Sequence, residues 1–383
     1  MAKFGIALGS GPRGLGFESR YSDHKTVITN VVTVFLVYVS YSRIFPIISV
    51  HTSTKTGVNY MCTAITYQTA NHYFGRNLDY DYPFPCSVII TPKAYSFSFS
   101  HEKAQNKHFA IIGMGMVQDG YPLYYDAMNE HGLSIAGLNF PGNATYLPCS
   151  DTKSNIAPYE LIPWILGQCS NLNEAKELLN MLNIIDKPFR TDIPLSPLHW
   201  IVADKTDAVT VEPTARGLKI YKNPVGVLTN NPPFPYHLDN LCNYLNVSAL
   251  EAHNRFSADL SLTAYSRGMG GWGLPGDMSS ASRFVRASFT KWNSPKTGTE
   301  KQSITQFFHI LDSVTQVDGC VQVNDRYEKT LYSSCCSQDK GVYYYTTYEN
   351  RQITAVSMYD YELQGDSLVC YPIRQEQQIL FEK

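Results

Sequence analysis

A cysteine near residue 60 is followed at short range by charged residues that could activate it. The stretch reads MCTAITYQTANHYFGRNLDYDYPF over residues 61–84. Cys62 opens a strand-like pattern, and Arg76, Asp79 and Asp81 follow it. A thiol in this setting is either a small buried hydrophobe or a nucleophile whose thiolate a nearby arginine stabilises. The choice between them depends on whether a base is available to take the thiol proton.

Cys62 could supply that base itself if it were the first residue of the chain. A free α-amine has a reference pKa of roughly 7.7–8, so at neutral pH it can accept the thiol proton directly or through water. Arg76 would then favour the thiolate, and Asp79 could orient the ammonium. Met61 before a small residue is the arrangement from which an initiator methionine is removed. We therefore expect Met61 to be the true start and Cys62 to become residue one.

Other catalytic and ligand motifs are missing from the sequence. The glycines of GMGGWG at 268–273 follow no strand pattern, so they predict a flexible active-site loop rather than a dinucleotide site. No H-E-x-x-H or G-x-S-x-G pattern occurs, and Cys62 lacks a papain-type local signature. Nine cysteines without a C-x-x-C pair argue against a disulfide framework and a zinc site, and they favour a reduced, cytoplasmic setting. We expect no metal and no cofactor.

Composition and charge limit the classes of binding partner that we expect. The chain of 383 residues is 44% apolar and 17% charged, as a globular protein is. Its net charge of −2 gives no reason to expect nucleic acid or an anionic membrane as a partner.

The first sixty residues do not resemble the rest of the chain. Their apolar run lacks charge only between Thr26 and Ser42, which is shorter than the ~20 residues of a spanning helix. No small-residue cleavage site follows closely, as a signal peptide requires. We interpret residues 1–61 as an extension outside the functional domain, translated from a misplaced start. A removable leader and a membrane or partner element are the alternatives. The functional domain is then 62–383.

From residue 61 onward the pattern predicts an α+β domain. Strands are expected at 86–92, 108–117, 122–129, 133–140, 198–204, 208–214 and 218–223, with a hairpin at 342–360. Helices are expected at 156–169, 171–182, 235–246, 279–292 and 302–314. Mostly antiparallel strands interrupted by pairs of helices predict two sheets with helices on their outer faces.

Long blocks of the sequence resemble, in the same order, the choloylglycine hydrolase family of bile salt hydrolases and penicillin V acylases. Besides the Cys62 stretch they are YPLYYDAMNEHGLSIAGLNFPGNA (121–144), ELIPWILGQC (160–169), PLSPLHWIVAD (194–204), VLTNNPPFPYHL (227–238) and GLPGDMSSASRFVRASF (273–289). The resemblance covers 61–383 and none of 1–60. It implies an N-terminal nucleophile hydrolase with a four-layer αββα sandwich.

The resemblance also implies roles for the residues around the cysteine. Cys62 would be the nucleophile, Arg76 would lie beside its sulfur, and Asp79 would hold the α-amine. Alternatively, Arg76 and Asp79 could form a surface ion pair that contributes little energy.

Three residues from later blocks would complete this catalytic cluster. Asn139 and Asn230 would donate hydrogen bonds to the tetrahedral oxyanion, and Arg283 would complete the polar group. Taken singly, the asparagines could be ordinary turn residues and the arginine a helix cap.

The implied reaction is hydrolysis of the amide of glycine- or taurine-conjugated bile salts. Bile salt hydrolases resemble one another in carrying asparagine at position 139, where penicillin V acylases tend to carry tyrosine. Leu78, Phe140 and the loops near 184–195 and 268–276 are expected to form the pocket. Penicillin V acylase or another N-acyl amide hydrolase is the alternative substrate class, and a catalytically silent binding protein is the alternative function. By resemblance we also expect a homotetramer.

Overall fold

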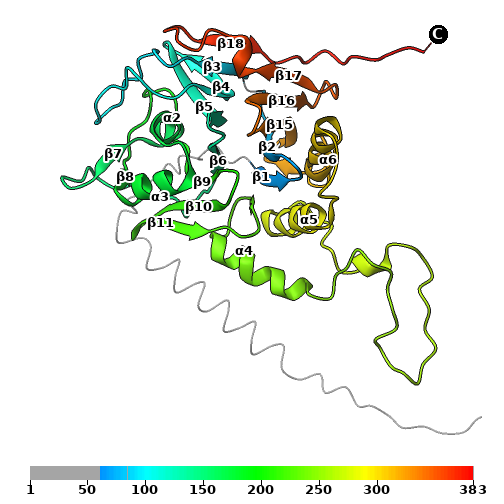
Figure 1. Ribbon diagram of the computed structural model, residues 1–383. Helices are drawn as coiled ribbons and strands as arrows, with labels where there is room; N and C mark the ends of the chain where they lie inside the picture. Colours follow the sequence, from blue (N-terminus) through cyan, green and yellow to red (C-terminus); the bar gives the residue numbers. More distant parts are fainter. Residues whose placement is uncertain (1–60, 84, 383) are drawn as a thin grey trace, which may run out of the picture. The chain divides into compact units, whose positions relative to one another are not determined.

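Two antiparallel sheets form the centre of the computed structural model, which describes residues 61–83 and 85–382 (Figure 1). The first sheet has the order β12 (Val227–Leu228), β1 (Met61–Gln68), β2 (His72–Tyr80), β15 (Lys329–Ser337), β16 (Val342–Thr347) and β17 (Thr354–Ser357). The second has the order β11 (Gly217–Lys222), β10 (Ala208–Thr214), β9 (Leu198–Ala203), β6 (Ser134–Asn139), β5 (Tyr121–Asn129), β4 (Ile111–Gln118), β3 (Ser87–Thr91) and β18 (Val369–Pro372). The interpretation of residues 1–60 lies outside the described residues.

Helices cover the outer face of each sheet (Figure 1). Helices α5 (Ser280–Asn293) and α6 (Glu300–Asp312) pack on the six-stranded sheet, and α2 (Leu161–Gln168) and α3 (Leu172–Asn180) pack on the eight-stranded sheet. Apolar side chains of both sheets share one buried core, and a second core joins the eight-stranded sheet to α2 and α3. The αββα sandwich expected from the sequence is therefore confirmed.

Shorter elements connect these layers. They are α4 (Phe234–Leu241), the 3₁₀ turns η1 (Pro158–Glu160), η2 (Cys242–Tyr244), η3 (Met269–Gly271) and η4 (Met358–Asp360), the parallel pair β7 (Ser154–Ile156) and β8 (Leu182–Ile184), and the hairpin β13 (Gln322–Val323) and β14 (Arg326–Tyr327).

Most of the predicted elements are confirmed with small shifts at their ends. The predicted helix over 156–169 begins as a 3₁₀ turn and becomes α-helical at Leu161, which leaves Pro163 in the first turn, where its missing N–H costs little. Asn171 caps α3 as expected, because its side chain accepts hydrogen bonds from the backbone N–H groups of Asn173 and Glu174.

The long central strand β15 was not predicted. Its sequence, KTLYSSCCS, is rich in hydroxyls and thiols and lacks apolar alternation, yet nearly all of it is buried. The hydroxyls are satisfied inside the protein, since Ser333 donates to Asn77 and Ser334 donates to Asp126. Gly75 on β2 lets this strand approach closely, because a Cβ there would lie 2.0 Å from the Ser334 carbonyl oxygen.

Candidate active site

Cys62 lies inside the sandwich on the strand that opens the described domain. It is fully buried and pairs with Leu78 in the antiparallel β1–β2 ladder. Its sulfur accepts a hydrogen bond from Nη2 of Arg76, which lies on β2. The short β1–β2 turn thus brings together the cysteine and arginine that the sequence singled out.

Arg76 is fixed by the second sheet. Its Nη1 donates to the carbonyl oxygens of Tyr125 on β5, at 3.2 Å, and Gly137 on β6, at 2.5 Å. Both Arg76 and Asp79 are fully buried, so the interpretation of these two residues as a surface ion pair is wrong.

Asn230 and Arg283 meet the backbone of Cys62. The Cys62 N–H donates to Oδ1 of Asn230 at 2.9 Å, and Nη2 of Arg283 donates to the same oxygen at 2.7 Å. Nη1 of Arg283 also donates to the Cys62 carbonyl oxygen at 2.5 Å. Asn230 reaches this position because it follows β12, which pairs with β1, and Arg283 lies in the first turn of α5. Arg283 is therefore more than a helix cap.

Asp79 lies within the same cluster on β2. Its Oδ1 accepts a hydrogen bond from Thr330 at 2.6 Å, and its Oδ2 lies 4.0 Å from Nη1 of Arg283. Oδ2 has no hydrogen-bond partner among the described residues. Burial raises the pKa of Asp79 to about 6, although Arg283 and the Thr330 hydroxyl lower it. With residue 61 attached, the Cys62 N–H donates a hydrogen bond to Asn230, and Oδ2 of Asp79 accepts none from the described residues.

Asn139 ends β6 beside the thiol. Its carbonyl oxygen accepts a hydrogen bond from Nδ2 of Asn230 at 2.8 Å, and its backbone N–H interacts with the Cys62 sulfur. Its own Oδ1 is buried without a partner in the described part of the chain. The structure thus brings all six of the predicted catalytic residues together: Cys62, Arg76, Asp79, Asn139, Asn230 and Arg283.

The thiol is not activated in this state. Burial raises the pKa of Cys62 to about 11, Arg76 lowers it, Asp79 raises it, and Arg283 and the Asn139 N–H lower it. Because burial outweighs both guanidinium groups, the thiol is protonated at neutral pH while Cys62 is joined to Met61. A base is needed to convert it into a nucleophile.

Sequence reasoning missed one buried acid on the amino side of the cysteine. Glu328, between β14 and β15, accepts a hydrogen bond from the Met61 N–H at 2.5 Å and is almost fully buried. Burial, and after it the nearby Asp79, raises the pKa of Glu328 to about 8. No motif marks this residue, since only the pairing of β15 with β2 brings it to the start of β1.

An apolar cavity of about 330 Å³ opens beside Arg76. Leu78 lines it as predicted, and so does the loop that includes Phe189, Ile193 and Leu195. Residues 268–276 are not part of its lining. Phe140 is also elsewhere, because its ring is fully buried and stacks on His199 with 4.2 Å between ring centroids.

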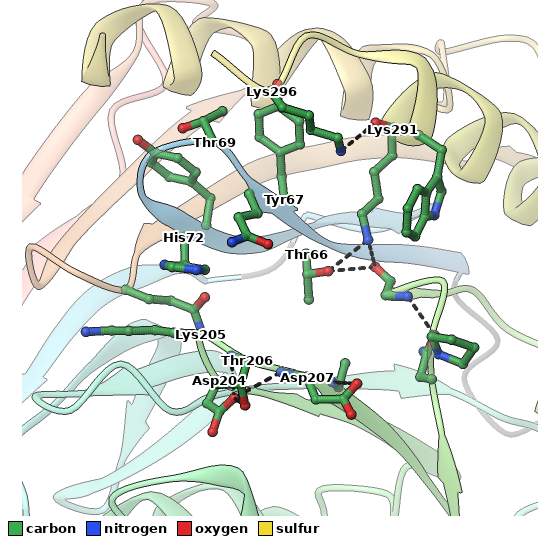
Figure 2. A pocket seen from close by; sticks show the side chains of 18 residues that line it. Thr66, Tyr67, Thr69, His72, Asp204, Lys205, Thr206, Asp207, Lys291 and Lys296 are labelled. Carbon is green, nitrogen blue, oxygen red and sulfur yellow. Dashed lines mark hydrogen bonds between the residues drawn. The ribbon is translucent and has the colours of Figure 1, made fainter. Parts of the chain in front are cut away.

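A second cavity, of about 460 Å³, lies at the other end of β1. Figure 2 shows Thr66, Tyr67 and Lys291 on one side of it and the turn that carries Asp204 on the other. None of the six predicted catalytic residues lines it. Lys291 is committed to structure there, since its Nζ donates to Thr66 at 2.9 Å and to two backbone carbonyls.

Comparison with known proteins identifies this arrangement. The family described as linear amide C–N hydrolases, choloylglycine hydrolase family, matches residues 62–371. The chain belongs to the choloylglycine hydrolase family. Family membership confirms the resemblance found in the sequence, and it makes the chain an enzyme that hydrolyses linear amide C–N bonds. The family match begins at the cysteine that the structure surrounds with the predicted residues.

Curated relatives cover almost the whole domain. A bile salt hydrolase/transferase from Lactiplantibacillus plantarum is 54% identical over 319 residues, which are 83% of this chain and 98% of that protein. A bile salt hydrolase/transferase from Clostridium perfringens is 39% identical over 317 residues, 81% of this chain and 96% of that one.

Solved structures agree with this assignment. A conjugated bile acid hydrolase from Clostridium perfringens superposes with a TM-score of 0.79 at 36% identity, covering 84% of this chain and all of that one. A penicillin V acylase from Agrobacterium tumefaciens, at 18% identity and a TM-score of 0.65, covers 81% of this chain and 90% of that one, and it shares the fold. Within the described residues, no helix combines the length and apolar character needed to cross a membrane.

Proposed function

We propose that this enzyme hydrolyses the amide bond of glycine- or taurine-conjugated bile salts, with Cys62 as the nucleophile. The observation that carries the proposal is the contact between the Cys62 sulfur and Arg76 at the wall of an apolar cavity. The bile salt hydrolases among its relatives, and asparagine rather than tyrosine at position 139, support this substrate over penicillin V.

The first half of the reaction uses the free α-amine of Cys62. This amine takes the thiol proton, and Arg76 stabilises the thiolate as its sulfur attacks the amide carbon. Asn139 and Asn230 stabilise the oxyanion that forms. The new ammonium gives its proton to the leaving nitrogen, the C–N bond breaks, and glycine or taurine departs from a thioester.

The second half restores the enzyme. The α-amine takes a proton from water, the resulting hydroxide attacks the thioester carbon, and the bile acid leaves as the sulfur recovers its proton. Asp79 is suited to hold the α-ammonium, because its Oδ2 is buried, close to Arg283 and without a hydrogen bond.

The cavity suits a steroid. Its lining is mostly apolar, with Leu123, Ile162 and Phe189 among the side chains, and the Arg76 guanidinium lies at one wall. A pocket with many apolar contacts and few polar anchors is typical of sites for small amphipathic molecules. The acyl group would occupy the cavity, and its amide carbonyl would lie at the sulfur.

The mechanism requires that nothing precedes Cys62. We propose that residues 1–61 lie outside the catalytic domain of 62–383 and must be absent from the active enzyme. In support, the Cys62 nitrogen is an amide when residue 61 is attached, and an amide cannot accept the thiol proton.

We further propose a cytoplasmic homotetramer. All nine cysteines lie in the described residues and none forms a disulfide, which suits a reducing compartment. The segment between α4 and α5 extends away from the sheets (Figure 1). It exposes large apolar side chains that a subunit interface would bury: Leu245, Leu250, Phe256, Tyr265 and Trp272.

Turnover of taurocholate and penicillin V by the protein that begins at Cys62 tests the substrate. We expect release of taurine at a kcat/KM at least tenfold above that for penicillin V. A preference for penicillin V would identify an acylase, and turnover of neither by a folded protein would favour a binding function.

A further inference from the structure

A buried carboxylate joins the two sheets behind the thiol. Asp126 on β5 is fully buried, and its Oδ1 accepts a hydrogen bond from the Tyr332 hydroxyl at 2.6 Å. Its Oδ2 accepts from Ser334 at 3.0 Å and from Tyr343 at 2.7 Å. The three donors lie on β15 and β16 of the other sheet. Three hydroxyl donors directed at two oxygens are what a buried carboxylate needs in order to remain ionised.

The same network reaches the arginine that contacts the nucleophile. Ser334 donates to Asp126 and accepts a hydrogen bond from the Arg76 backbone N–H at 3.1 Å. The Arg76 guanidinium donates to the carbonyl of Tyr125, the neighbour of Asp126 on β5. Asp126 is therefore connected to the Arg76 backbone through Ser334, and the residue before it on β5 binds the Arg76 side chain.

The connection between Asp126 and Arg76 balances a buried positive charge. The Arg76 guanidinium is fully buried, and two buried carboxyl groups, Asp126 and Asp79, lie within electrostatic range of it. A cation inside a protein is costly unless an anion nearby compensates it. Burial raises the pKa of Asp126, and Arg76 is the largest influence that lowers it, so the two charges stabilise each other.

We propose that Asp126 is a positioning residue of this amide hydrolase, and that its ionised carboxylate is the counter-charge that holds the Arg76 guanidinium against the Cys62 sulfur. This inference rests on the proposed role of Cys62 as nucleophile. It adds a third layer to the site, in which the sulfur contacts Arg76 and Asp126 balances Arg76. Tyr332, Ser334 and Tyr343 hold Asp126.

The groups that face this network define the expected titration. Arg76 and the thiols of Cys86 and Cys336 are within electrostatic range of Asp126. Arg76 and Asp79 on β2 and Arg283 on α5 act on the Cys62 thiol. Of these, Arg76 and Arg283 favour the Cys62 thiolate and Asp79 opposes it.

Asp126→Asn in the protein that begins at Cys62 tests the counter-charge. The variant keeps the shape of the side chain and removes the negative charge that holds the Arg76 guanidinium at the Cys62 sulfur. We expect the pKa of Cys62, followed as the pH dependence of its alkylation by iodoacetamide and localised by peptide mass, to rise by roughly half a unit or more, because a guanidinium that moves away from the sulfur stabilises the thiolate less. We also expect kcat to fall about tenfold or more with a small change in KM, because the guanidinium loses its fixed position.

The matched control for that experiment is Glu160→Gln. Glu160 is also a buried carboxylate, but its hydrogen bonds come from Ser100 and the Ala157 N–H, whereas Asp126 shares Ser334 with Arg76. An unchanged alkylation profile in a folded Asp126→Asn protein, or an equal change in Glu160→Gln, would overturn the proposal.

A second variant keeps the proposal testable if Asp126→Asn does not fold. Tyr343→Phe removes one donor, so the carboxylate accepts a proton at higher pH. Activity that needs the ionised form is then lost sooner on acidification, and the acid limb of the kcat profile moves to higher pH. Tyr73→Phe is its control, because Tyr73 is likewise buried and its hydroxyl donates to another carboxylate, Glu300, at 3.2 Å. Equal profiles for the two variants would contradict the proposal.

These results are separable from the proposed function. Alkylation needs no substrate, so an Asp126-dependent thiol titration in a protein that hydrolyses no bile salt would refute the substrate and keep the positioning role. Turnover of taurocholate with no dependence on Asp126 would support the proposed substrate and refute the positioning role.

Discussion

At Cys62, burial and two guanidinium groups act on the pKa of the thiol in opposite directions. Burial is the larger effect, so the sulfur carries its proton at neutral pH even though Arg76 donates a hydrogen bond to it. The residues around the sulfur can therefore stabilise a thiolate but cannot create it. The missing partner is a base, and the atom best placed to become one is the nitrogen of the same residue.

Replacing Cys62 tests its proposed role as the nucleophile. Cys62→Ala should abolish amide hydrolysis, and Cys62→Ser should leave a much weaker nucleophile, because an alcohol is far harder to deprotonate than a thiol. Turnover is followed as amine released from taurocholate. Cys169→Ala is the control, since it removes another buried thiol that lies in the second core. Substantial hydrolysis by Cys62→Ala would rule this nucleophile out.

Asn230 is the predicted oxyanion donor whose side chain bonds the backbone of Cys62. Its side chain links the Cys62 N–H, Arg283 and the Asn139 carbonyl. Asn230→Ala should lower kcat by about 10²–10³ with a smaller effect on KM. Asn231→Ala is the matched neighbour, because its side chain bonds Pro141 and Asn143 instead of the cysteine, and it should lose less than tenfold. Equal losses would show that the 230–231 turn matters only for folding.

At the level of elements, local patterns predicted the parts of the fold that alternate or have helical period. They missed β15, whose hydroxyls and thiols lack an apolar alternation but are buried against Asn77 and Asp126. In the site, likewise, the residues close together in the sequence were predicted and a residue far along the chain was missed. Cys62 and Arg76 lie on paired strands in one short stretch, whereas Glu328 reaches residue 61 only through the β15–β2 pairing. Such long-range contacts leave no local signature in a single sequence.

The pocket was predicted only in part for the same reason. Leu78 precedes Asp79 on β2 and lines the cavity, but Phe140, one residue beyond Asn139, turns away and stacks on His199. Alternation along a strand and its continuation decides which neighbour faces the site, and the bend after β6 cannot be read from residue types.

The loop that lines the cavity should contribute to binding of the steroid. Ile193→Asp should raise KM for taurocholate by about tenfold or more and change kcat less, because a carboxylate in an apolar pocket opposes burial of the steroid. Steady-state kinetics measure both constants. Met181→Asp, an exposed apolar residue outside the cavity, should leave KM unchanged. An unaffected KM in Ile193→Asp would place the acyl group elsewhere.

At the scale of the whole molecule, the buried ionisable groups of the site lower the stability of the fold when they are charged. Asp79, Glu328 and Arg283 are all buried near the start of β1, and the pKa values of both acids are raised, to about 6 and about 8. A carboxyl group whose pKa is higher in the folded state stabilises the fold at low pH, and this contribution is lost as pH rises through the folded value.

The full chain should accordingly lose stability between about pH 4.5 and pH 8. Glu328→Gln keeps an acceptor for the Met61 N–H and removes the ionisation, so the slope of unfolding free energy against pH should flatten. The difference at pH 8 should be on the order of several kcal/mol in favour of the variant. Urea unfolding at a series of pH values measures it. Glu349→Gln, at an exposed acid, is the control, and parallel slopes for parent and Glu328→Gln would contradict this account.

The requirement for a free amine at Cys62 is tested most directly by intact mass and activity measured on the same samples. One sample is the full chain with residue 61 still attached, and the other begins at Cys62. We predict that the full chain releases no taurine from taurocholate and that the chain beginning at Cys62 does so readily. Equal turnover by a full chain whose mass shows no cleavage would contradict the mechanism.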